Sequence, residues 1–508
     1  MADNILKTGI YTNETVVRET LEQPIDADFS LPDYYGDIRK ILKCKAVSGI
    51  TSKSLSGKTV SIEGVITVTV FYCDEDGKIN SFEYPYSYQK TKEINGDTED
   101  AILRASAKCE YINCRAVTGR KIDIHGAVSI KIAVIKKRKK DVISDIDDRN
   151  IEILRCTAPA TTPTGFAEKY LFVEEECEIG SENGGDILLR YDTDACIKEC
   201  KTVSGKVIVK GELTVNTRFS ENGCIKCMKT AVPYSQIIEI DTAGEGCESD
   251  AKVQICFADI KPRTDNDGKF KTVSLNAKLL ISAETYCKND IALIADAYSK
   301  KQKAKIETET VKVSRIYEKI NECFNCKKTV ETDDIKISSV LDDWYEVRVT
   351  ETKISSDSLN TSGTVTACFI VEEESGDSSY FEKIIDFKYK YPLNSNSDNL
   401  TAQPQITLNS CGYTILSEKS LDIHLELTIS AVIYEQNELS AVTGISIDEE
   451  KNEECNNDNA MVVYFAEKGE KLWDIAKKYF ASIEEIKTLN DISADVLENN
   501  MTILLPIK

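Results

Sequence analysis

Histidine is nearly absent from this chain, which has only His125 and His424 in 508 residues. Each ends a similar stretch, Ile-Asp-Ile-His at 122–125 and Leu-Asp-Ile-His at 421–424, so a structural role in a repeated strand explains them better than catalysis. Gly-x-Ser-x-Gly, Gly-x-x-x-x-Gly-Lys-Ser/Thr and His-Glu-x-x-His are also missing. We therefore expect no enzymatic activity and no cofactor.

Long apolar runs are missing as well. No 18 consecutive apolar residues occur, and residues 1–7 contain neither a basic segment nor an apolar one. We therefore expect a chain that has no transmembrane segment and is not exported by the usual route. The 18 cysteines are scattered through strand-like segments. In a cytoplasmic protein most of them should be reduced and buried as small hydrophobes.

Two Cys-x-x-Cys pairs, Cys224/Cys227 and Cys323/Cys326, could hold a metal only if they met in space. The pairs belong to different parts of the chain, and no histidine lies near either of them in sequence. We therefore expect thiols without a metal or redox role and no metal site.

Positive charge is in deficit, with 63 basic against 85 acidic residues and a net charge of -22. This balance argues against nucleic acid as a partner and against simple electrostatic attachment to anionic lipid. The one basic run, Lys-Lys-Arg-Lys-Lys at 136–140, is followed by several aspartates. A solvated strand end or loop explains it, and contact with phosphate or a membrane surface is the alternative.

Two strand patterns recur at intervals of roughly 150 residues. Both alternate apolar and polar residues, which predicts strands with one buried face. The first contains a glycine, which suggests a bulge or close packing against an opposite sheet. The first pattern occurs at 62–70, 209–215 and 361–369, and the second at 122–130, 273–279 and 421–429. Strands separated by turns predict a mainly β protein built from tandem β-sandwich-like repeats.

The repeats set the expected domains. We place the first repeat, with an N-terminal segment, at 1–150, the second at 151–300 and the third at 301–445. An acidic stretch at 446–460 should be a linker, and 461–508 a small closing domain.

The closing domain has its own pattern. Apolar residues recur at helical spacing over 472–479 and 483–489, and short apolar runs flank this pair at 462–465 and 503–507. This order predicts a βααβ unit. Trp473 lies on the first helix, and the pattern leaves open whether it packs in the core or is an exposed aromatic anchor.

This segment resembles a LysM domain. The resemblance rests on Tyr464, Ala466, Gly469, Glu470, Leu472, Trp473, Ile475, Ala476, Tyr479, Ile486, Leu489, Asn490, Leu497, Asn500, Ile503, Leu505 and Pro506. LysM domains bind N-acetylglucosamine polymers, but the usual Gly-Asp-Thr is Gly469-Glu470-Lys471 here, Phe480 replaces a small or polar residue, and Asn500 replaces a glycine. These departures favour a protein partner. The expected partner-binding residues are Trp473, Leu472, Ile475, Gly469, Tyr479, Phe480 and Asn500.

The β repeats, with the segment Leu-Pro-Asp-Tyr-Tyr-Gly-Asp-Ile at 31–38, resemble the SPOCS domain of endospore-forming clostridia. Tandem SPOCS repeats before a LysM domain are similar to the SipL-like coat morphogenetic proteins. The resemblance implies an adaptor in the mother-cell cytoplasm at the forespore surface, which tethers coat proteins and whose LysM domain binds the sporulation ATPase of the coat basement layer. The alternative is a peptidoglycan-binding protein of the cortex or cell wall.

Overall fold

A computed structural model describes residues 5–301, 304–332, 334–395, 397–447 and 461–506. Strands make up 78% of the chain and helices 3%, so the predicted mainly β fold is confirmed. Most of the expected acidic linker lies outside the described residues. Among the residues described, no helix is long and apolar enough to cross a membrane.

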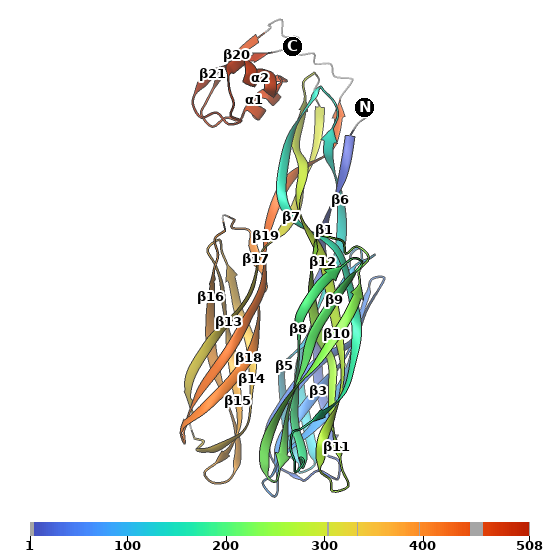
Figure 1. Ribbon diagram of the computed structural model, residues 1–508, viewed down its shortest axis with the longest axis vertical. Coiled ribbons are helices and arrows are strands. Elements are labelled where there is room, and N and C mark those ends of the chain that lie inside the picture. The colour runs from blue at the N-terminus through green and yellow to red at the C-terminus, as the bar shows by residue number, and fades with distance from the viewer. Residues whose placement is uncertain (1–4, 302–303, 333, 396, 448–460, 507–508) are drawn as a thin grey trace.

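The chain forms three β-sandwich units in sequence order, each made of two antiparallel sheets (Figure 1). In the first unit, the sheet β1-β6-β5 packs on β2-β3-β4. The bounds are β1 Ile5–Ser30, β2 Ile38–Ser56, β3 Thr59–Asp74, β4 Ile79–Glu93, β5 Ile102–Thr118 and β6 Lys121–Ile146.

The second unit repeats this order, with β11-β12-β7 packed on β10-β9-β8. Its bounds are β7 Ile151–Glu178, β8 Ile187–Val203, β9 Lys206–Glu221, β10 Cys224–Glu239, β11 Cys247–Thr264 and β12 Phe270–Ser299. In the third unit, β13, β19, β17 and β18 pack on β14-β15-β16. These strands are β13 Ala304–Glu331, β14 Ile337–Ile354, β15 Ser358–Glu373, β16 Ser378–Pro392, β17 Leu400–Ala402, β18 Gln405–Ser417 and β19 Ser420–Ile447.

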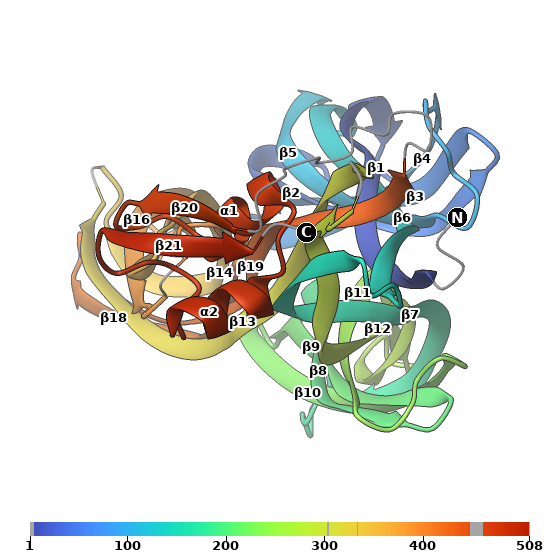
Figure 2. The same cartoon turned by 90° about the horizontal axis from the view of Figure 1, so that it is seen from above.

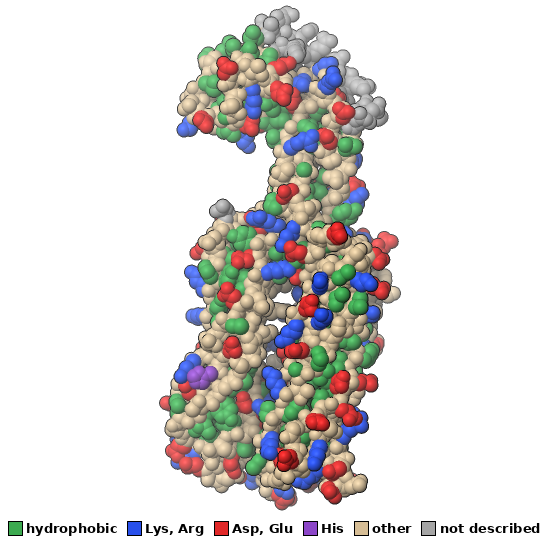
Figure 3. Space-filling model, viewed as in Figure 1, with side chains coloured by type: hydrophobic (Ala, Val, Ile, Leu, Met, Phe, Trp, Pro, Cys, Tyr) green, Lys and Arg blue, Asp and Glu red, His purple; other side chains and the backbone are tan. Residues whose placement is uncertain are grey.

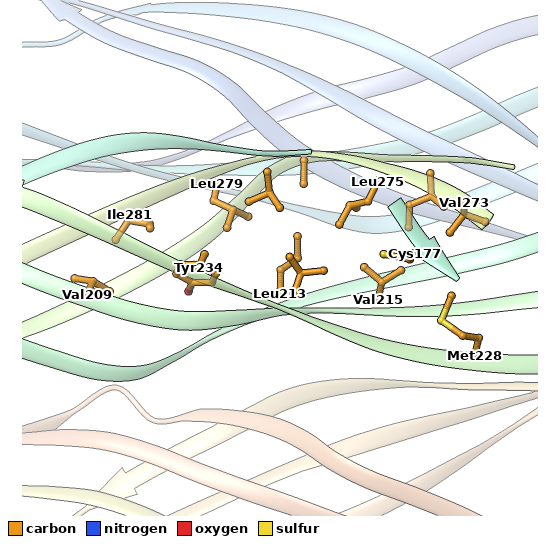
Figure 4. Close-up of a cluster of buried hydrophobic side chains, with 14 of the residues drawn as sticks. Cys177, Val209, Leu213, Val215, Met228, Tyr234, Val273, Leu275, Leu279 and Ile281 are labelled. Carbon is orange, nitrogen blue, oxygen red and sulfur yellow. The ribbon is translucent and has the colours of Figure 1, made fainter. Parts of the chain in front are cut away.

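Alternation along the central strands fills each sandwich. In the second unit, side chains from β9 and β12 interdigitate between the sheets (Figure 4). Those labelled there include Val209, Leu213, Val215, Leu275, Leu279 and Ile281, all 1% exposed or less. The period-two pattern read from the sequence is therefore the pattern of the core.

The repeated glycine has a steric cause. A Cβ on Gly211 would lie 2.2 Å from the carbonyl oxygen of Cys196 and 2.4 Å from the ring of Tyr234. Gly64 and Gly363 face an aromatic ring of the adjacent strand in the same way. The register also shifts opposite each of these glycines, in β2, β8 and β14. The absence of a side chain at each glycine leaves room for an aromatic ring from the adjacent strand of the same sheet, beside a bulge. The close packing therefore occurs within one sheet and not against the opposite sheet.

One antiparallel pair from each unit continues beyond its sandwich, and the three pairs, β1/β6, β7/β12 and β13/β19, pack together as a stalk. Seen from above, the three units surround this common axis (Figure 2). The buried residues of the stalk are Ile10, Val142, Ile143, Ile146, Ile151, Ala158, Ala160, Leu293, Ile294, Ala297, Val311, Val313, Ala441 and Val442.

Below the stalk the contacts between units differ in kind, and include both ion pairs and aromatic stacking. The carboxylate of Asp342 accepts hydrogen bonds from Arg190 at 3.1 Å and Arg218 at 3.0 Å, which joins the second and third units. Burial raises the pKa of Asp342, and the two arginines act against that rise. The first and third units meet where Phe71 stacks on Trp344, with ring centroids 5.6 Å apart. The second and third units are therefore joined by an ion-pair cluster, and the first and third units by stacked aromatic rings.

The cysteines depart in part from expectation. Cys44 is joined to Cys114 and Cys247 to Cys287, while the other described cysteines are free thiols. The expectation that most are buried is wrong, because the only buried free cysteines among the described residues are Cys73, Cys177, Cys256 and Cys368. Each Cys-x-x-Cys pair lies within one strand, where side chains three apart point to opposite faces. The described residues contain no cluster of potential metal ligands.

Candidate functional site

The candidate site is the small C-terminal domain and the part of the stalk on which it lies. The domain consists of β20 Met461–Ala466, α1 Leu472–Tyr479, α2 Ile483–Asn490 and β21 Met501–Pro506. β20 pairs antiparallel with β21, so the predicted βααβ order is present. Each helix has a C-cap residue in the left-handed conformation, Phe480 after α1 and Asp491 after α2.

The seven expected partner-binding residues do not share one surface. Leu472 and Ile475 are core residues, 1% and 3% exposed. Tyr479 packs against Tyr464, with centroids 5.7 Å apart, and Phe480 is the half-buried cap of α1. Gly469 and Asn500 belong to two exposed loops that are joined by hydrogen bonds at one end of the domain. Trp473 is the one that contacts another domain.

Trp473 is packed between the closing domain and the stalk. Its side chain is 8% exposed, and its ring meets Tyr298 of β12 edge to face at a centroid distance of 5.0 Å. The indole Nε1–H donates to Oδ2 of Asp296 at 2.9 Å. The sequence left open whether Trp473 packs in the core or is an exposed aromatic anchor. In the structure Trp473 is buried and is also an aromatic anchor, because it packs on the stalk of the same chain.

A basic residue one turn along α1 completes the contact with Asp296. Lys477 Nζ donates to both carboxylate oxygens, at 2.7 and 2.6 Å. Lys477 lies in the last turn of α1, where a cation interacts favourably with the helix dipole. The Asp296 carboxylate therefore accepts from two side chains on one face of the helix. We call Asp296, Tyr298 and Glu152 the stalk seat.

The other two seat residues bind the turn between the helices. Tyr298 donates its hydroxyl proton to the carbonyl oxygen of Ala481 at 2.7 Å. Ser482 donates to Glu152 at 3.2 Å, and Glu152 is also paired with Lys300 at 3.1 Å. Burial, and to a smaller extent the charge of Glu152, raises the pKa of Tyr298, so its hydroxyl stays protonated and able to donate. The turn and α1 are thus held at separate points.

A bulge near the end of β12 aims Asp296 at the domain. The pairing of β12 with β7 shifts between Ile294 and Asp296. The same shift occurs in β6 before Asp145 and in β19 before Gly444. Asp145 is paired with Arg155 at 2.6 Å, and Gly444 has no side chain to offer. Only the second unit therefore presents a carboxylate to the closing domain at this position.

Sequence reasoning missed the stalk seat, although one signal was present. Ile-Ser-Asp-Ile at 143–146 and Ile-Ala-Asp-Ala at 294–297 share a pattern. An alignment of the strand ends would have singled out both aspartates. It would not have shown that one of them binds a helix far along the chain.

The loops that carry sugar contacts in LysM domains are joined by backbone hydrogen bonds here. Gly469 N–H donates to Leu497 at 2.8 Å, and Leu497 N–H donates back to Glu470 at 2.9 Å. The Glu470 carboxylate accepts from the backbone of Glu467 at 2.8 Å and from Tyr464 at 2.9 Å. Those two donors hold the pKa of Glu470 below its usual range. Glu470 therefore stabilises the loop through hydrogen bonds within the domain.

One face of the domain exposes apolar side chains. Met461 and Val463 are each 53% exposed and Phe465 is 77% exposed, all on the outward face of β20. Leu504, the β21 partner of Val463, is 36% exposed. We call these four residues the β20 face. In Figure 1, α1 is on the side of the domain toward the stalk and β21 is on the far side.

Comparison with known families agrees with this anatomy. The model of the SipL SPOCS domain matches residues 37–117 and 186–262, and the LysM domain model matches residues 466–506. The chain carries SipL SPOCS domains and a LysM domain. The two SPOCS matches begin one residue before β2 and one residue before β8, and they extend into β5 and β11. In the third unit, β14 to β18 hold the same places. No curated protein and no solved structure matches the chain.

The combination of SPOCS and LysM domains indicates a spore-coat-related protein. LysM domains belong to a class that binds peptidoglycan. In this chain the LysM domain lies on the stalk seat, above the third β-sandwich unit (Figures 1 and 2). The stalk contacts the LysM helix face that includes Trp473, whereas the four side chains of the β20 face are exposed.

Proposed function

We propose that this protein is a non-enzymatic adaptor of spore coat assembly that acts in the mother-cell cytoplasm at the forespore surface. Its LysM domain binds a protein of the coat basement layer, the sporulation ATPase polymer, and its SPOCS units tether other coat proteins. The observation that carries the proposal is the exposed, apolar β20 face on a LysM domain whose scaffold is intact.

The β20 face suits a protein partner better than a sugar polymer. Its four exposed side chains are apolar, and apolar and aromatic residues dominate the centres of protein interfaces. Exposed apolar groups clustered on one face of a small domain favour association. The stalk carries this face away from the SPOCS units, so the two ends can engage different partners at once (Figure 1).

Attachment at several points supports assembly on a surface. A partner that forms a polymer presents many copies of one site, and a tethered adaptor then binds with a high effective concentration. Each contact can be weak while the whole array is retained. This is the behaviour expected of a layer-building protein.

Peptidoglycan binding is the second candidate, and the LysM match at residues 466–506 supports it. Backbone hydrogen bonds join the two loops even though Glu470 and Lys471 replace the usual residues. A glycan ligand would contact these loops and would not need the β20 face.

Binding of the purified full-length protein to the purified basement-layer ATPase tests the proposal. We expect Phe465→Ser to weaken binding by at least about tenfold, since loss of a buried aromatic anchor costs about 2 kcal/mol or more. Ile384→Ser removes a side chain of similar exposure, 60%, from a SPOCS unit and should leave affinity unchanged. Equal affinity of wild type and Phe465→Ser would contradict the β20 face as the partner site.

A further inference from the structure

A cavity lies where the stalk joins the three SPOCS units. Its volume is about 840 Å³, and strands from every unit line it: β1 and β6, β7 and β12, and β13 and β19. In Figure 3, Lys and Arg side chains gather where the stalk meets the body. We call this space the junction cavity. Cavities of about 300–1,000 Å³ are of the size that holds small organic ligands.

The lining is cationic in an acidic protein. Two carboxylates line the junction cavity, those of Glu14 and Glu284. The cations that line it are Arg104, Lys137, Arg138, Lys139, Lys140 and Lys312. Four of these belong to the basic run at 136–140, in a chain whose net charge is -22. Arg104 pairs with Glu284 and Arg138 with Glu14, so the four lysines are the excess of positive charge within the lining. An excess of one sign of charge in a hollow focuses the field and concentrates ions of the opposite sign.

Lys137 is the cation most available to a ligand. Among the described residues its Nζ meets no carboxylate, and it donates instead to the carbonyl of Thr164 at 3.3 Å. It also lies 4.8 Å from the ring centroid of Tyr11. A carbonyl and a ring leave the lysine charge uncompensated, so an anion in the cavity can pair with it.

The remaining cations are paired, but mostly at exposed positions. Lys139 contacts Asp141 at 2.8 Å and Lys140 contacts Glu309 at 2.7 Å, with the lysine side chains 52% and 43% exposed. Lys312 contacts Glu438 at 3.1 Å and is 77% exposed. Exposed pairs of this kind contribute about 0–1 kcal/mol. A ligand with several negative charges can therefore bind these cations, because breaking the existing ion pairs costs little free energy.

Apolar and aromatic side chains also line the cavity. Tyr11 and Phe166 contribute rings, and Arg104 lies 5.4 Å from the ring centroid of Phe166. The aliphatic lining includes Ile102, Ile135, Ile291, Val311, Val313 and Ile316. An inorganic anion would use only the cations, whereas an anion with an apolar body would use both parts.

We propose that the junction cavity binds a phosphorylated organic molecule, with its phosphate groups among Lys137 and Lys139 and its apolar or aromatic part against Tyr11 and Phe166. The ligand touches strands of all three units and so stabilises their junction. The phosphate can belong to a soluble nucleotide or to a phospholipid headgroup.

Calorimetric titration of the full-length protein with ATP tests the soluble arm. We expect saturable binding and a higher Tm at saturation, since ligand that binds only the folded state stabilises it. Pyrophosphate, which lacks the ring, should bind more weakly. Lys137→Gln with Lys139→Gln should weaken ATP binding at least about tenfold, while Lys206→Gln with Lys271→Gln, two exposed lysines of the second unit, should not.

Flotation with phosphatidylglycerol vesicles tests the lipid arm. Vesicle binding that the Lys137→Gln and Lys139→Gln variant loses would support the proposal with a lipid as the source of phosphate. Two results would overturn it. One is the absence of both ATP and vesicle binding by the wild type. The other is binding that the variant, folded by circular dichroism, keeps unchanged.

Discussion

Asp296→Ala should release the LysM domain from the stalk. The Asp296 carboxylate is the shared acceptor for Trp473 at 2.9 Å and for Lys477 at 2.6 and 2.7 Å. Alanine removes all three hydrogen bonds and leaves the two donors without this acceptor. The LysM core should remain folded, because Leu472, Ile475 and Ile486 pack within the domain.

The magnitude follows from the two kinds of contact. A hydrogen bond to a charged acceptor contributes about 1.5–3 kcal/mol, and the indole bond is mostly shielded from water because Trp473 is 8% exposed. The Lys477 pair is partly exposed, at 41% and 26% for the two side chains, so solvent screening limits it to about 0–1 kcal/mol. Together these give about 1.5–4 kcal/mol. The equilibrium between the seated and the released domain should shift by roughly 10- to 700-fold.

Tryptophan fluorescence reads this shift directly, because the chain has only two tryptophans. Trp344 is 4% exposed between the first and third β-sandwich units and should stay buried in every variant. On release, Trp473 should become accessible to acrylamide and its emission should move to longer wavelength. Asp145→Ala, at the equivalent bulge, removes a carboxylate paired with Arg155 and should leave the spectrum unchanged. An identical quenching profile for wild type and Asp296→Ala would refute the reasoning.

Three further predictions concern stability. The pKa of Glu470 is lowered in the folded state. Its contribution to the stability of the folded LysM domain is therefore fully present above the unfolded glutamate pKa and is lost as pH falls through the lower folded pKa. Glu470→Gln should remove this acid dependence of the LysM melting transition. Asp342→Ala leaves two arginines without their shared acceptor and should cost about 3–5 kcal/mol in urea unfolding, and an unchanged midpoint would contradict a structural role for this contact. Gly211→Ala places a Cβ 2.2 Å from a Cys196 atom and should cost about 1–3 kcal/mol, whereas Gly244→Ala, with nothing within 4 Å, should leave the Tm within a few degrees of wild type.

The fold was largely predictable because its signals are local. Period-two alternation marks the buried faces of β3, β9 and β15, and the recurrence of the glycine marks three copies of one unit. The LysM domain was predictable because its motif is dense and short. Neither signal depends on how distant segments meet.

The seat of the LysM domain was not predictable, because it joins Trp473 to Asp296, 177 residues earlier in the chain. Sequence spacing placed Trp473 on an amphipathic helix but could not say which surface covers it. The junction cavity was hidden for the same reason. A basic run reads as a solvated strand end until three separate strand pairs are brought around it.

Co-sedimentation tests the central claim, that the LysM domain acts as a protein-binding module of an adaptor. The full-length protein is mixed in parallel with polymerised basement-layer ATPase and with purified peptidoglycan, and each pellet is measured. The account predicts that the protein pellets with the ATPase polymer and that Phe465→Ser stays in the supernatant. Sedimentation with peptidoglycan alone, unaffected by Phe465→Ser, would contradict it.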